Sequence, residues 1–499
     1  MIETNFAAID WVIVAVYLAG SLGMGLLAMR YIGRLRDFLV AGRQVRLGLL
    51  IATMTGTEIG LVTLMYAAQE GFSRGLSAFH IGLIELVCYG FVGLTGFLIF
   101  RLRREGVMTI PEFYEKRYNR PVRVVGAIIL TLGGILNFGM FLRAGAQFVG
   151  GVTGTVSVET INLIMTVLLV LVLAYTILGG MVSVVITDFI QFVVLSVGLL
   201  VATYFSLKAV GGWGQLVETG LSARGEGFLN PLAHEEYGFS YAFWMVLVTV
   251  SSATMWMPSV MRCLSAHNPR TAKNVYVWSS ISFMTRRVLP AVWGACALVF
   301  ILGVPQLREV FLEVPEDQRK QAVLAMPIFL GHVVPTGLLG LLVAGMLAGF
   351  MSTHDSYLLA FSGVITQDIV SPLRGGRLSD RGRITLTRVL IFVIGVFLLI
   401  WGLWFELKGT LWDYMALTGT VYFAGALPVL VGGLYWRRAS STGAMLALLA
   451  GLVALAPIFS VSLNEHKRTI ALLAFAMAAV LMVVFSLLFP DRPKAEDEN

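Results

Sequence analysis

Long apolar stretches recur along the whole of this chain, and they constrain its fold more than any other feature. A helix that crosses a bilayer needs about 20 mostly apolar residues. Backbone groups inside hydrocarbon must be paired within their own segment, as they are in a helix. The sequence therefore predicts an all-α polytopic membrane protein with about thirteen transmembrane helices. The apolar runs lie near residues 9–29, 47–70, 78–100, 123–149, 159–178, 183–207, 239–261, 275–303, 327–366, 386–405, 410–435, 441–460 and 468–489.

Composition supports this class and narrows the expected partners. Of 499 residues, 57% are hydrophobic and 13% are charged, whereas soluble domains carry roughly 25% charge. The net charge of +7 comes from lysines and arginines that concentrate between the apolar runs. We therefore expect a lipid bilayer and a small-molecule substrate as partners and no nucleic acid. A monomer or a loose homodimer fits this composition.

The basic residues between the runs also predict an orientation. If thirteen segments alternate, the loops after the first, third, ninth and eleventh lie on one side, and the positive-inside rule makes that side cytoplasmic. The N-terminus is then outside and the C-terminus inside, and we expect a bacterial inner (plasma) membrane. These loops contain Arg34, Arg36, Arg43, Arg46, Arg101, Arg103, Arg104, Lys116, Arg117, Arg120, Arg123, Arg374, Arg377, Arg381, Arg383, Arg437 and Arg438.

A polar cluster interrupts the ninth run, in the stretch GFMSTHDS at residues 349–356. Gly349, Ser352, Thr353 and Ser356 follow helical spacing, so one helix face carries a bare backbone and three hydroxyls. Asp355 lies beside this stripe. Hydroxyl, carbonyl and carboxylate oxygens are the ligands of hard cations. The cluster predicts a small cation bound at mid-membrane.

The second run is also interrupted, by the stretch TGTEIG at residues 55–60. Two glycines flank a carboxylate there. Broken helices expose carbonyls and half-helix ends, from which transporters build ion and substrate sites near the membrane midplane. We expect a break in both this run and the ninth.

Three stretches resemble the sodium:solute symporter family: TGTEIG at 55–60, YTILGG at 175–180 followed by TDFIQ at 187–191, and MSTHDS at 351–356. The resemblance implies a LeuT-like inverted-repeat fold, with one helix before two five-helix repeats and two helices after them. A single transporter domain would cover residues 1–499. Its first repeat would span 47–207, its second 239–435, and the extra C-terminal helices 441–489.

The same resemblance implies sodium as the transported coupling ion and supplies candidate ligands. One sodium would bind the carbonyls of Gly56, Ile59 and Gly349 and the hydroxyls of Ser352 and Thr353. Relatives often carry alanine where this chain has the two glycines, but those ligands are backbone atoms. A second sodium, found in some members, maps to Asp188, Ser352, Asp355 and Ser356. Asp355 replaces the serine of the two-sodium members, which argues against that second ion.

Ionisable residues inside the runs are candidates for solute binding, because an unpaired charge in a membrane is costly. Arginine binds carboxylates through two nitrogens, and a carboxylate takes an ammonium or a hydroxyl. The alternative is an internal ion-pair network, such as Glu85 with Arg287, that only holds helices together. Arg286 and Arg287 are adjacent, so we expect at most one to reach the site. Aided by the resemblance, the candidate substrate-binding residues are Thr57, Glu58, Thr63, His80, Glu85, Arg143 and Arg287.

The predicted function is sodium-coupled symport of a small polar organic solute by alternating access. A zwitterion or carboxylate is the first expectation, and a sugar or polyol is the second. A proton-coupled carrier that uses Asp188, Asp355 or Glu58 remains an alternative, as does a transporter-like solute sensor. Hydrolase and ATPase motifs such as H-E-x-x-H or G-x-S-x-G are absent from the sequence, so we do not expect an enzyme.

Overall fold

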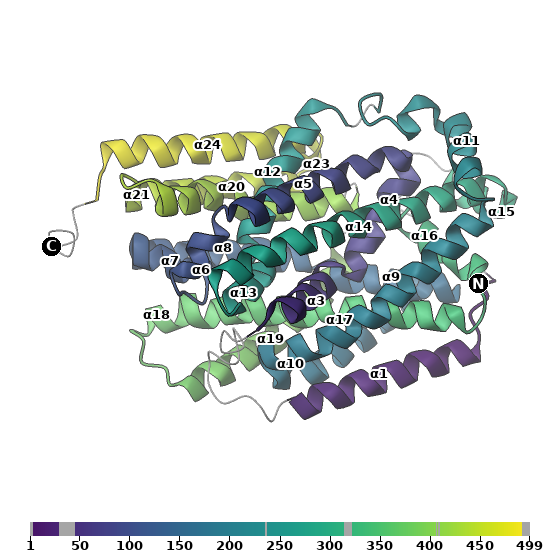
Figure 1. The fold of residues 1–499 in the computed structure, drawn as a ribbon, viewed down its shortest axis with the longest axis horizontal. Helices are drawn as coiled ribbons and strands as arrows, with labels where there is room; N and C mark the ends of the chain where they lie inside the picture. The colour runs from purple at the N-terminus through teal and green to yellow at the C-terminus, as the bar shows by residue number, and fades with distance from the viewer. Residues whose placement is uncertain are drawn as a thin grey trace.

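The computed structural model describes residues 3–28, 45–234, 237–313, 322–405, 407 and 410–491. Within these residues it is all-α, apart from an isolated backbone bridge between Val45 and Ala266. Long helices run alongside one another (Figure 1), and the N-terminal end of α1 lies at the opposite end of the bundle from the C-terminal end of α24. Arg34, Arg36 and Arg43, three of the loop arginines used for orientation, lie outside the described residues.

The helices divide into long bundle members and short connecting pieces. The long ones are α1 (Ala8–Ala28), α3 (Leu47–Glu58), α4 (Leu61–Arg74), α5 (Phe79–Thr95), α8 (Arg120–Phe138), α9 (Phe141–Thr153), α10 (Val158–Ala209), α11 (Trp213–Arg224), α12 (Phe239–Met255), α13 (Met257–Ser265), α14 (Pro269–Leu302), α16 (Ala322–Val333), α17 (Leu338–Val364), α19 (Asp380–Trp404), α20 (Leu411–Tyr435), α21 (Ser441–Ala450) and α24 (Lys467–Leu488). The short ones are η3 (Gly75–Ala78), α6 (Ile99–Arg104), α7 (Ile110–Arg117), η4 (Gly225–Phe228), α15 (Pro305–Phe311), η6 (Ile365–Val370), α18 (Ser371–Leu373), η7 (Gly451–Leu455), α22 (Ala456–Phe459) and α23 (Val461–Asn464).

The break predicted in the second run is confirmed. Helix α3 ends at Glu58 and α4 begins at Leu61, with Ile59 and Gly60 between them. A Cβ atom on Gly60 would lie 2.2 Å from the Thr353 Oγ1 atom. Glycine is therefore required where this break meets α17.

A second broken helix was not predicted. Helices α12 and α13 meet at Trp256 with a bend of 42°. Trp256 has an extended backbone, and Pro258 lies in the first turn of α13, where a proline is tolerated because its missing N–H would have no partner. The Met-Pro dipeptide at 257–258 was the available signal, but the surrounding apolar run reads as one continuous helix.

The break predicted in the ninth run is wrong. Helix α17 continues without interruption from Leu338 to Val364, through the whole polar stretch 349–356. The run instead divides earlier, because α16 ends at Val333 and Gly337 adopts a positive φ of 85° before α17 begins. The polar side chains need no break, since neighbouring helices supply their partners.

The number of membrane crossings stays a prediction. In the described part of the chain, nine helical segments are long and apolar enough to cross a bilayer, or ten if the bent α12–α13 pair counts as one. The expected pair of helices at 159–178 and 183–207 forms one continuous element, α10. Its second part, Thr187–Ala209, is one of those segments, whereas Val158–Ala174 is a shorter apolar helix.

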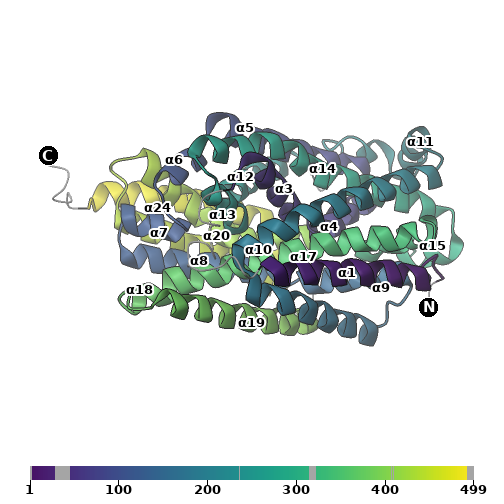
Figure 2. The ribbon, with the colours of Figure 1, turned by 60° about the horizontal axis from the view of Figure 1, so that its bottom comes forward.

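Close packing places α17 against α10 and α14 against α4. Both views show α17 running beside α10 (Figures 1 and 2). A Cβ on Gly345 would lie 3.0 Å from the Val194 carbonyl, and one on Gly294 would lie 1.9 Å from that of Ala68. Small residues permit this approach of helix backbones in membranes. The packing holds α17 and α14 on two sides of the α3–α4 break.

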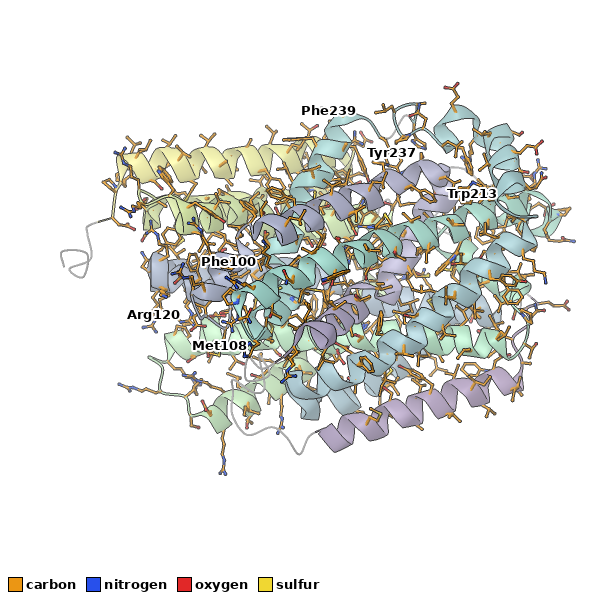
Figure 3. All side chains as sticks on the ribbon, viewed as in Figure 1. Phe100, Met108, Arg120, Trp213, Tyr237 and Phe239 are labelled. Carbon is orange, nitrogen blue, oxygen red and sulfur yellow. The ribbon has the colours of Figure 1, made fainter. Side chains whose placement is uncertain are left out.

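A group of basic residues lies at one end of the bundle. Figure 3 labels Phe100, Met108 and Arg120 near the end where α24 finishes, and Trp213 and Tyr237 toward the other end. Arg101, Arg104, Lys116 and Arg117 lie in and beside α6 and α7 at the first of these ends. This distribution agrees with the charge pattern used to predict orientation.

Candidate ion and solute site

The α3–α4 break lies directly against the polar face of α17. The Thr353 hydroxyl donates hydrogen bonds to the Thr57 carbonyl at 2.9 Å and to the Gly349 carbonyl at 2.8 Å. A Cβ on Gly349 would lie 2.8 Å from the Ile59 carbonyl oxygen. A Cβ on Gly56 would lie 3.5 Å from the Ser352 Oγ atom. The structure thus brings together all five predicted residues of the first sodium site.

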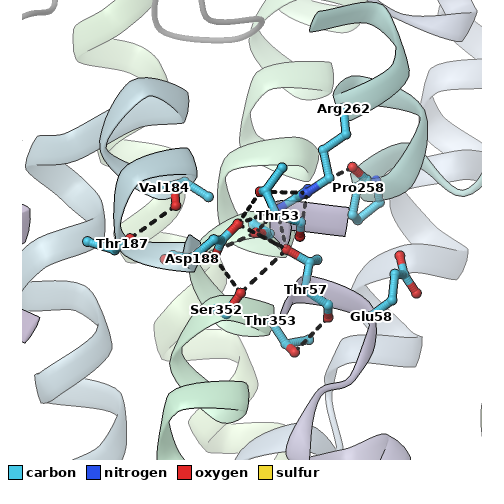
Figure 4. Close-up of polar contacts among 12 residues, drawn as sticks. Thr53, Thr57, Glu58, Val184, Thr187, Asp188, Pro258, Arg262, Ser352 and Thr353 are labelled. Carbon is cyan, nitrogen blue, oxygen red and sulfur yellow. Dashed lines mark hydrogen bonds and ion pairs between the residues drawn. The ribbon is translucent and has the colours of Figure 1, made fainter. Parts of the chain in front are cut away.

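Asp188 on α10 joins this junction from a third helix. Its carboxylate is fully buried and accepts hydrogen bonds from the Ser352 and Thr53 hydroxyls. The Thr57 hydroxyl is a third neighbour, 3.3 Å from Asp188 Oδ2. Figure 4 shows these groups converging from α3, α10 and α17. Oxygen atoms of the type that sodium requires are therefore concentrated here.

Arg262 of α13 extends its guanidinium into the same cluster. Its Nη2 atom lies 3.1 Å from Asp188 Oδ2 and 2.5 Å from Ser356 Oγ, and it also donates to the Thr57 hydroxyl. Its Nε atom donates to the Thr53 carbonyl at 3.2 Å, and its Nη1 atom to the Pro258 carbonyl at 2.8 Å. All three nitrogens of this arginine have protein partners (Figure 4).

The guanidinium lies among the residues that the resemblance mapped to a second sodium. Ser352 and Ser356 both contact this cluster, and the Ser356 hydroxyl donates to Asp355 Oδ1 at 3.1 Å. A positive charge is thus already present beside Asp188. Sequence reasoning missed Arg262 because the predicted helix ended at 261, which left this arginine at the membrane boundary.

A small cavity of about 80 Å³ lies on the other side of the α3–α4 break. Four of the predicted substrate residues line it, namely Glu58, Thr63, Glu85 and Arg287. The remaining lining residues are mostly apolar or aromatic. They are Val62, Tyr66, Tyr89, Asn137, Phe141, Val248, Thr249, Ser252, Trp256, Arg286, Tyr357, Trp412, Met415, Ala416, Gly419 and Phe423.

Two glutamates and two arginines form one buried network in the cavity wall. Arg286 joins the two glutamates, with its Nη1 atom 2.8 Å from Glu58 Oε2 and its Nε atom 2.9 Å from Glu85 Oε2. Arg287 Nε lies 2.7 Å from Glu85 Oε1, which is the ion pair considered above as an alternative. The Ser259 hydroxyl donates to the other oxygen of Glu58.

The expectation that only one of the adjacent arginines reaches the site is wrong. Both Arg286 and Arg287 line the cavity, and both bind the same carboxylate of Glu85. Side chains of consecutive helical residues diverge by about 100°, but a long arginine stem can turn back around the helix. A shared acceptor between them makes this geometry favourable.

Arg287 also packs against two aromatic rings that lie beside each other. Its guanidinium carbon lies 3.7 Å from the Trp412 ring centroid and 4.4 Å from that of Tyr66, within the range of cation–π attraction. The side chain is 4% exposed. Its Nη1 atom has no hydrogen-bond partner among the described residues. Arg287 is therefore fixed in position, while the N–H groups of its Nη1 atom make no hydrogen bond within the described residues.

Three predicted substrate residues lie elsewhere. Thr57 belongs to the Asp188 cluster, where its hydroxyl lies 3.1 Å from Ser356 Oγ. His80 bonds the Ser77 carbonyl at 2.7 Å and contacts the Tyr237 ring edge-on. Arg143 donates to the Phe405 carbonyl at 3.0 Å and lines a different cavity of about 170 Å³. The resemblance thus placed Arg143 at the solute site, whereas the structure places it in a separate cavity.

Broken helices that place an oxygen-rich junction beside a buried polar cavity define an ion-coupled secondary transporter with a LeuT-like fold. The chain belongs to the sodium:solute symporter family, whose model matches residues 38–451. It is therefore an integral membrane transporter and not an enzyme, and the family implies sodium as its coupling ion.

Curated relatives cover most of the chain at low identity. A sodium/mannose cotransporter from Bos taurus is 26% identical over 90% of this chain and 78% of its own length. A sodium/glucose cotransporter from Vibrio parahaemolyticus is 24% identical over 90% and 85%. Human sodium-coupled monocarboxylate transporter 2 is 26% identical over 79% and 62%. These relatives carry chemically different solutes, so the family alone does not identify the solute of this chain.

Solved structures agree on the fold. A Na+-coupled sialic acid symporter superimposes with a TM-score of 0.80 at 17% identity, covering 98% of this chain and all of that chain. Mhp1, a nucleobase-cation-symport-1 family transporter, gives a TM-score of 0.52 at 14% identity, over 92% of this chain and 97% of its own. At these identities the comparison establishes shared architecture only.

Proposed function

We propose that this protein carries a small polar organic solute across the membrane together with sodium, by alternating access. A carboxylate or zwitterion is the favoured solute, and a sugar or polyol is second. The observation that carries the proposal is the position of Glu58. It ends α3 next to Ile59 of the ion junction, and its side chain lines the solute cavity. Ion and solute would therefore meet at one break in one helix.

The sodium would bind the carbonyls of Gly56, Ile59 and Gly349 and the hydroxyls of Ser352 and Thr353. Five neutral oxygens suit a monovalent hard cation that has lost its water. The hydrogen bond from Thr353 to the Thr57 carbonyl already ties α17 to the break. Sodium would add ion–oxygen bonds across the same junction and so hold the cavity wall at Glu58 in place.

We infer a single sodium for each transport cycle. Asp188 and Ser356 contact the Arg262 guanidinium, and Asp355 bonds Ser356. A second cation among these residues would lie close to a fixed positive charge and would be repelled. In this proposal the three residues hold Arg262 in place of the second ion.

The two inverted repeats are proposed to span 47–207 and 239–435, with extra helices in 441–489. Each proposed repeat begins with a broken helix, α3–α4 in the first and α12–α13 in the second. Arg262 of α13 bonds Thr53 and Thr57 of α3, so the two breaks are tied together. When one repeat rocks against the other, either these hydrogen bonds break or α3 and α13 move together.

We propose that the N-terminus faces outward and the C-terminus faces the cytoplasm, in a bacterial inner membrane. The support is the concentration of Arg101, Arg104, Lys116 and Arg117 around one groove at the end of the bundle where α24 finishes. Lysine and arginine are enriched in cytoplasmic loops. Sodium would then enter from the opposite end. A monomer or a loose homodimer is equally compatible with this arrangement.

The test is the thermal stability of the purified protein in sodium, potassium and choline chloride at equal ionic strength. A ligand that binds only the folded state raises stability by RT ln(1 + [L]/Kd). We expect a rise that is specific to sodium and that needs a higher sodium concentration in Ser352→Ala. Equal stability in all three salts would contradict sodium coupling, and a response to pH alone would favour a proton-coupled carrier.

A further inference from the structure

We propose that the solute is a small organic monocarboxylate, bound through its carboxylate to Arg287 and enclosed elsewhere by apolar and aromatic side chains. This inference rests on the proposed function, because it specifies the solute of the same cavity. It excludes zwitterions and sugars, which the general proposal leaves open. Three properties of the cavity carry it: a buried guanidinium nitrogen without a partner, a network whose charges already balance, and a wall that is largely apolar or aromatic.

The unused donor belongs to Arg287. The guanidinium is positioned on two sides, by Glu85 Oε1 at 2.7 Å from Nε and by the adjacent Trp412 and Tyr66 rings. Its buried Nη1 atom has no hydrogen-bond partner among the described residues. A buried donor without a partner costs free energy. An anionic oxygen in the cavity would supply that partner, in a charge-assisted hydrogen bond.

Both acidic side chains of the cavity already have a guanidinium partner. Both oxygens of Glu58 are bonded, one by Ser259 and the other by Arg286 at 2.8 Å. Both oxygens of Glu85 are bonded too, by Arg286 at 2.9 Å and by Arg287 at 2.7 Å. Two carboxylates and two guanidiniums balance in charge. A zwitterion would add an ammonium beside two guanidiniums in a network whose charges already balance, and such a charge is costly to bury.

Sodium balances the charge of a monoanion. Glu58 connects the cavity to the proposed sodium site at the adjacent Ile59 carbonyl. The cavity network is neutral as a whole, so one carboxylate adds one negative charge and one sodium adds one positive charge close by. Each would strengthen the binding of the other. A neutral solute would gain no such mutual attraction from the ion.

The remaining wall gives little support to a polyol. Val62, Phe141, Val248, Met415 and Phe423 present hydrocarbon to the cavity. Asn137 also lines it, but its amide nitrogen already donates to the Met415 carbonyl and the Thr418 hydroxyl. Hydroxyl groups of a sugar would lose water against this hydrocarbon and would have as partners mainly the hydroxyls of Thr63, Tyr89, Thr249 and Ser252. The alkyl or aromatic part of a carboxylate would lose no hydrogen bonds to water on entering this cavity.

Cavity size sets an approximate size for the solute. One water-sized group needs about 10–15 Å³ of this kind of volume. The volume of about 80 Å³ therefore holds roughly five to eight such groups. Short-chain carboxylates have about that number of non-hydrogen atoms.

The experiment compares four probes of similar size in sodium chloride: propionate, its neutral amide propionamide, the zwitterion β-alanine and the triol glycerol. Thermal stability of the purified protein and sodium-driven uptake into proteoliposomes are both measured. We expect propionate alone to raise stability and to be transported, and we expect its effect to require sodium. Arg287→Lys should weaken propionate by roughly 10- to 100-fold and leave stabilisation by sodium alone unchanged.

Arg101→Lys is the matched control. Arg101 also packs over an aromatic ring, 4.0 Å from the Tyr435 centroid, but it lines a separate groove. This variant should bind propionate normally. If Arg287→Lys does not fold, the selectivity of the unmodified protein among the four probes still decides the question.

The outcomes separate this inference from the proposed function. Suppose that sodium stabilises the protein. Equal responses to propionate and propionamide, or a preference for β-alanine or glycerol, would then overturn the monocarboxylate inference but not the proposed symport. Stabilisation by sodium with no response to any probe would also overturn it, since the cavity is sized for propionate. No response to sodium would overturn the symporter itself.

Discussion

Two buried arginines lie on either side of the α3–α4 break, and they differ in one decisive respect. Arg262 uses all three of its nitrogens within the protein, on Asp188, Ser356, Thr53 and their neighbours. Arg287 is equally buried but leaves its Nη1 atom without a partner in the described chain. The proposed binding of the solute by Arg287 rests on this unused donor, and Arg262 has none to offer.

The settings of the two side chains reinforce this contrast. Arg262 is enclosed by hydroxyls and a carboxylate that come from three helices, and it does not line the cavity. Arg287 faces the cavity and lies against aromatic rings, which can hold a cation without consuming its hydrogen-bond donors. Sequence alone gives both as intramembrane arginines. Only their surroundings separate the two roles.

The largest effect is expected for Arg262→Met. Removing the guanidinium leaves the Asp188 carboxylate buried without its positive partner, which typically costs about 3–5 kcal/mol. We expect poor expression and a much lower midpoint of thermal unfolding in detergent. The double variant Arg262→Met/Asp188→Asn removes both charges and should recover much of the loss. A single variant as stable as the parent protein would show that Arg262 is not a structural residue.

A smaller loss of stability and a larger loss of transport are expected for Arg287→Met. Glu85 keeps its bond to Arg286, so the folded state should lose only about 1–3 kcal/mol. Uptake should fall at least tenfold, because the solute loses its charged partner. Thermal unfolding and proteoliposome uptake measured on the same preparation check both parts. Unfolding as severe as in Arg262→Met would erase the distinction between the two arginines.

An intermediate effect is expected at the sodium junction that separates them. Ser352→Ala or Thr353→Ala removes one hydroxyl ligand, worth about 1–1.5 kcal/mol, so the sodium concentration for half-maximal uptake should rise about 5- to 10-fold. Ser362→Ala is the control, since Ser362 is a buried serine of the same helix that bonds only the Leu358 and Leu359 carbonyls. Equal sodium dependence in all three variants would place the ion elsewhere.

Sequence reasoning located groups whose chemistry is local and missed those that depend on packing. The TGTEIG stretch predicted the α3–α4 break, because glycine and a buried carboxylate are poor choices inside an ordinary membrane helix. The GFMSTHDS stretch suggested a second break, but α17 continues because α3 and α10 satisfy its side chains. Arg262 was missed because its partners come from α3 and α10, which are distant in sequence. The Trp256 break had only the Met-Pro dipeptide at 257–258 as its signal.

The residues that the resemblance assigned to the sodium site lie together, on closely packed helix faces. Some that it assigned to the solute do not, because the alignment along those helices is less certain to be in register. The five residues of the first sodium site gather around one junction because Gly60 and Gly349 fix how closely the break and α17 approach. Four of seven proposed substrate residues, Glu58, Thr63, Glu85 and Arg287, line one cavity. His80 and Arg143 do not, because an alignment can shift along a helix without losing its hydrophobic pattern.

The smallest effect is expected for Arg143→Met, which tests that shift directly. Arg143 donates one hydrogen bond to the Phe405 carbonyl and lines a cavity that shares no residue with the Arg287 cavity. Losing one such bond should cost about 1 kcal/mol of stability. The solute concentration for half-maximal uptake should stay within roughly twofold of the parent value. A tenfold increase in that concentration would indicate that Arg143 also contacts the solute. An unused donor in the Arg287 cavity would then no longer be enough to identify the residues that bind it.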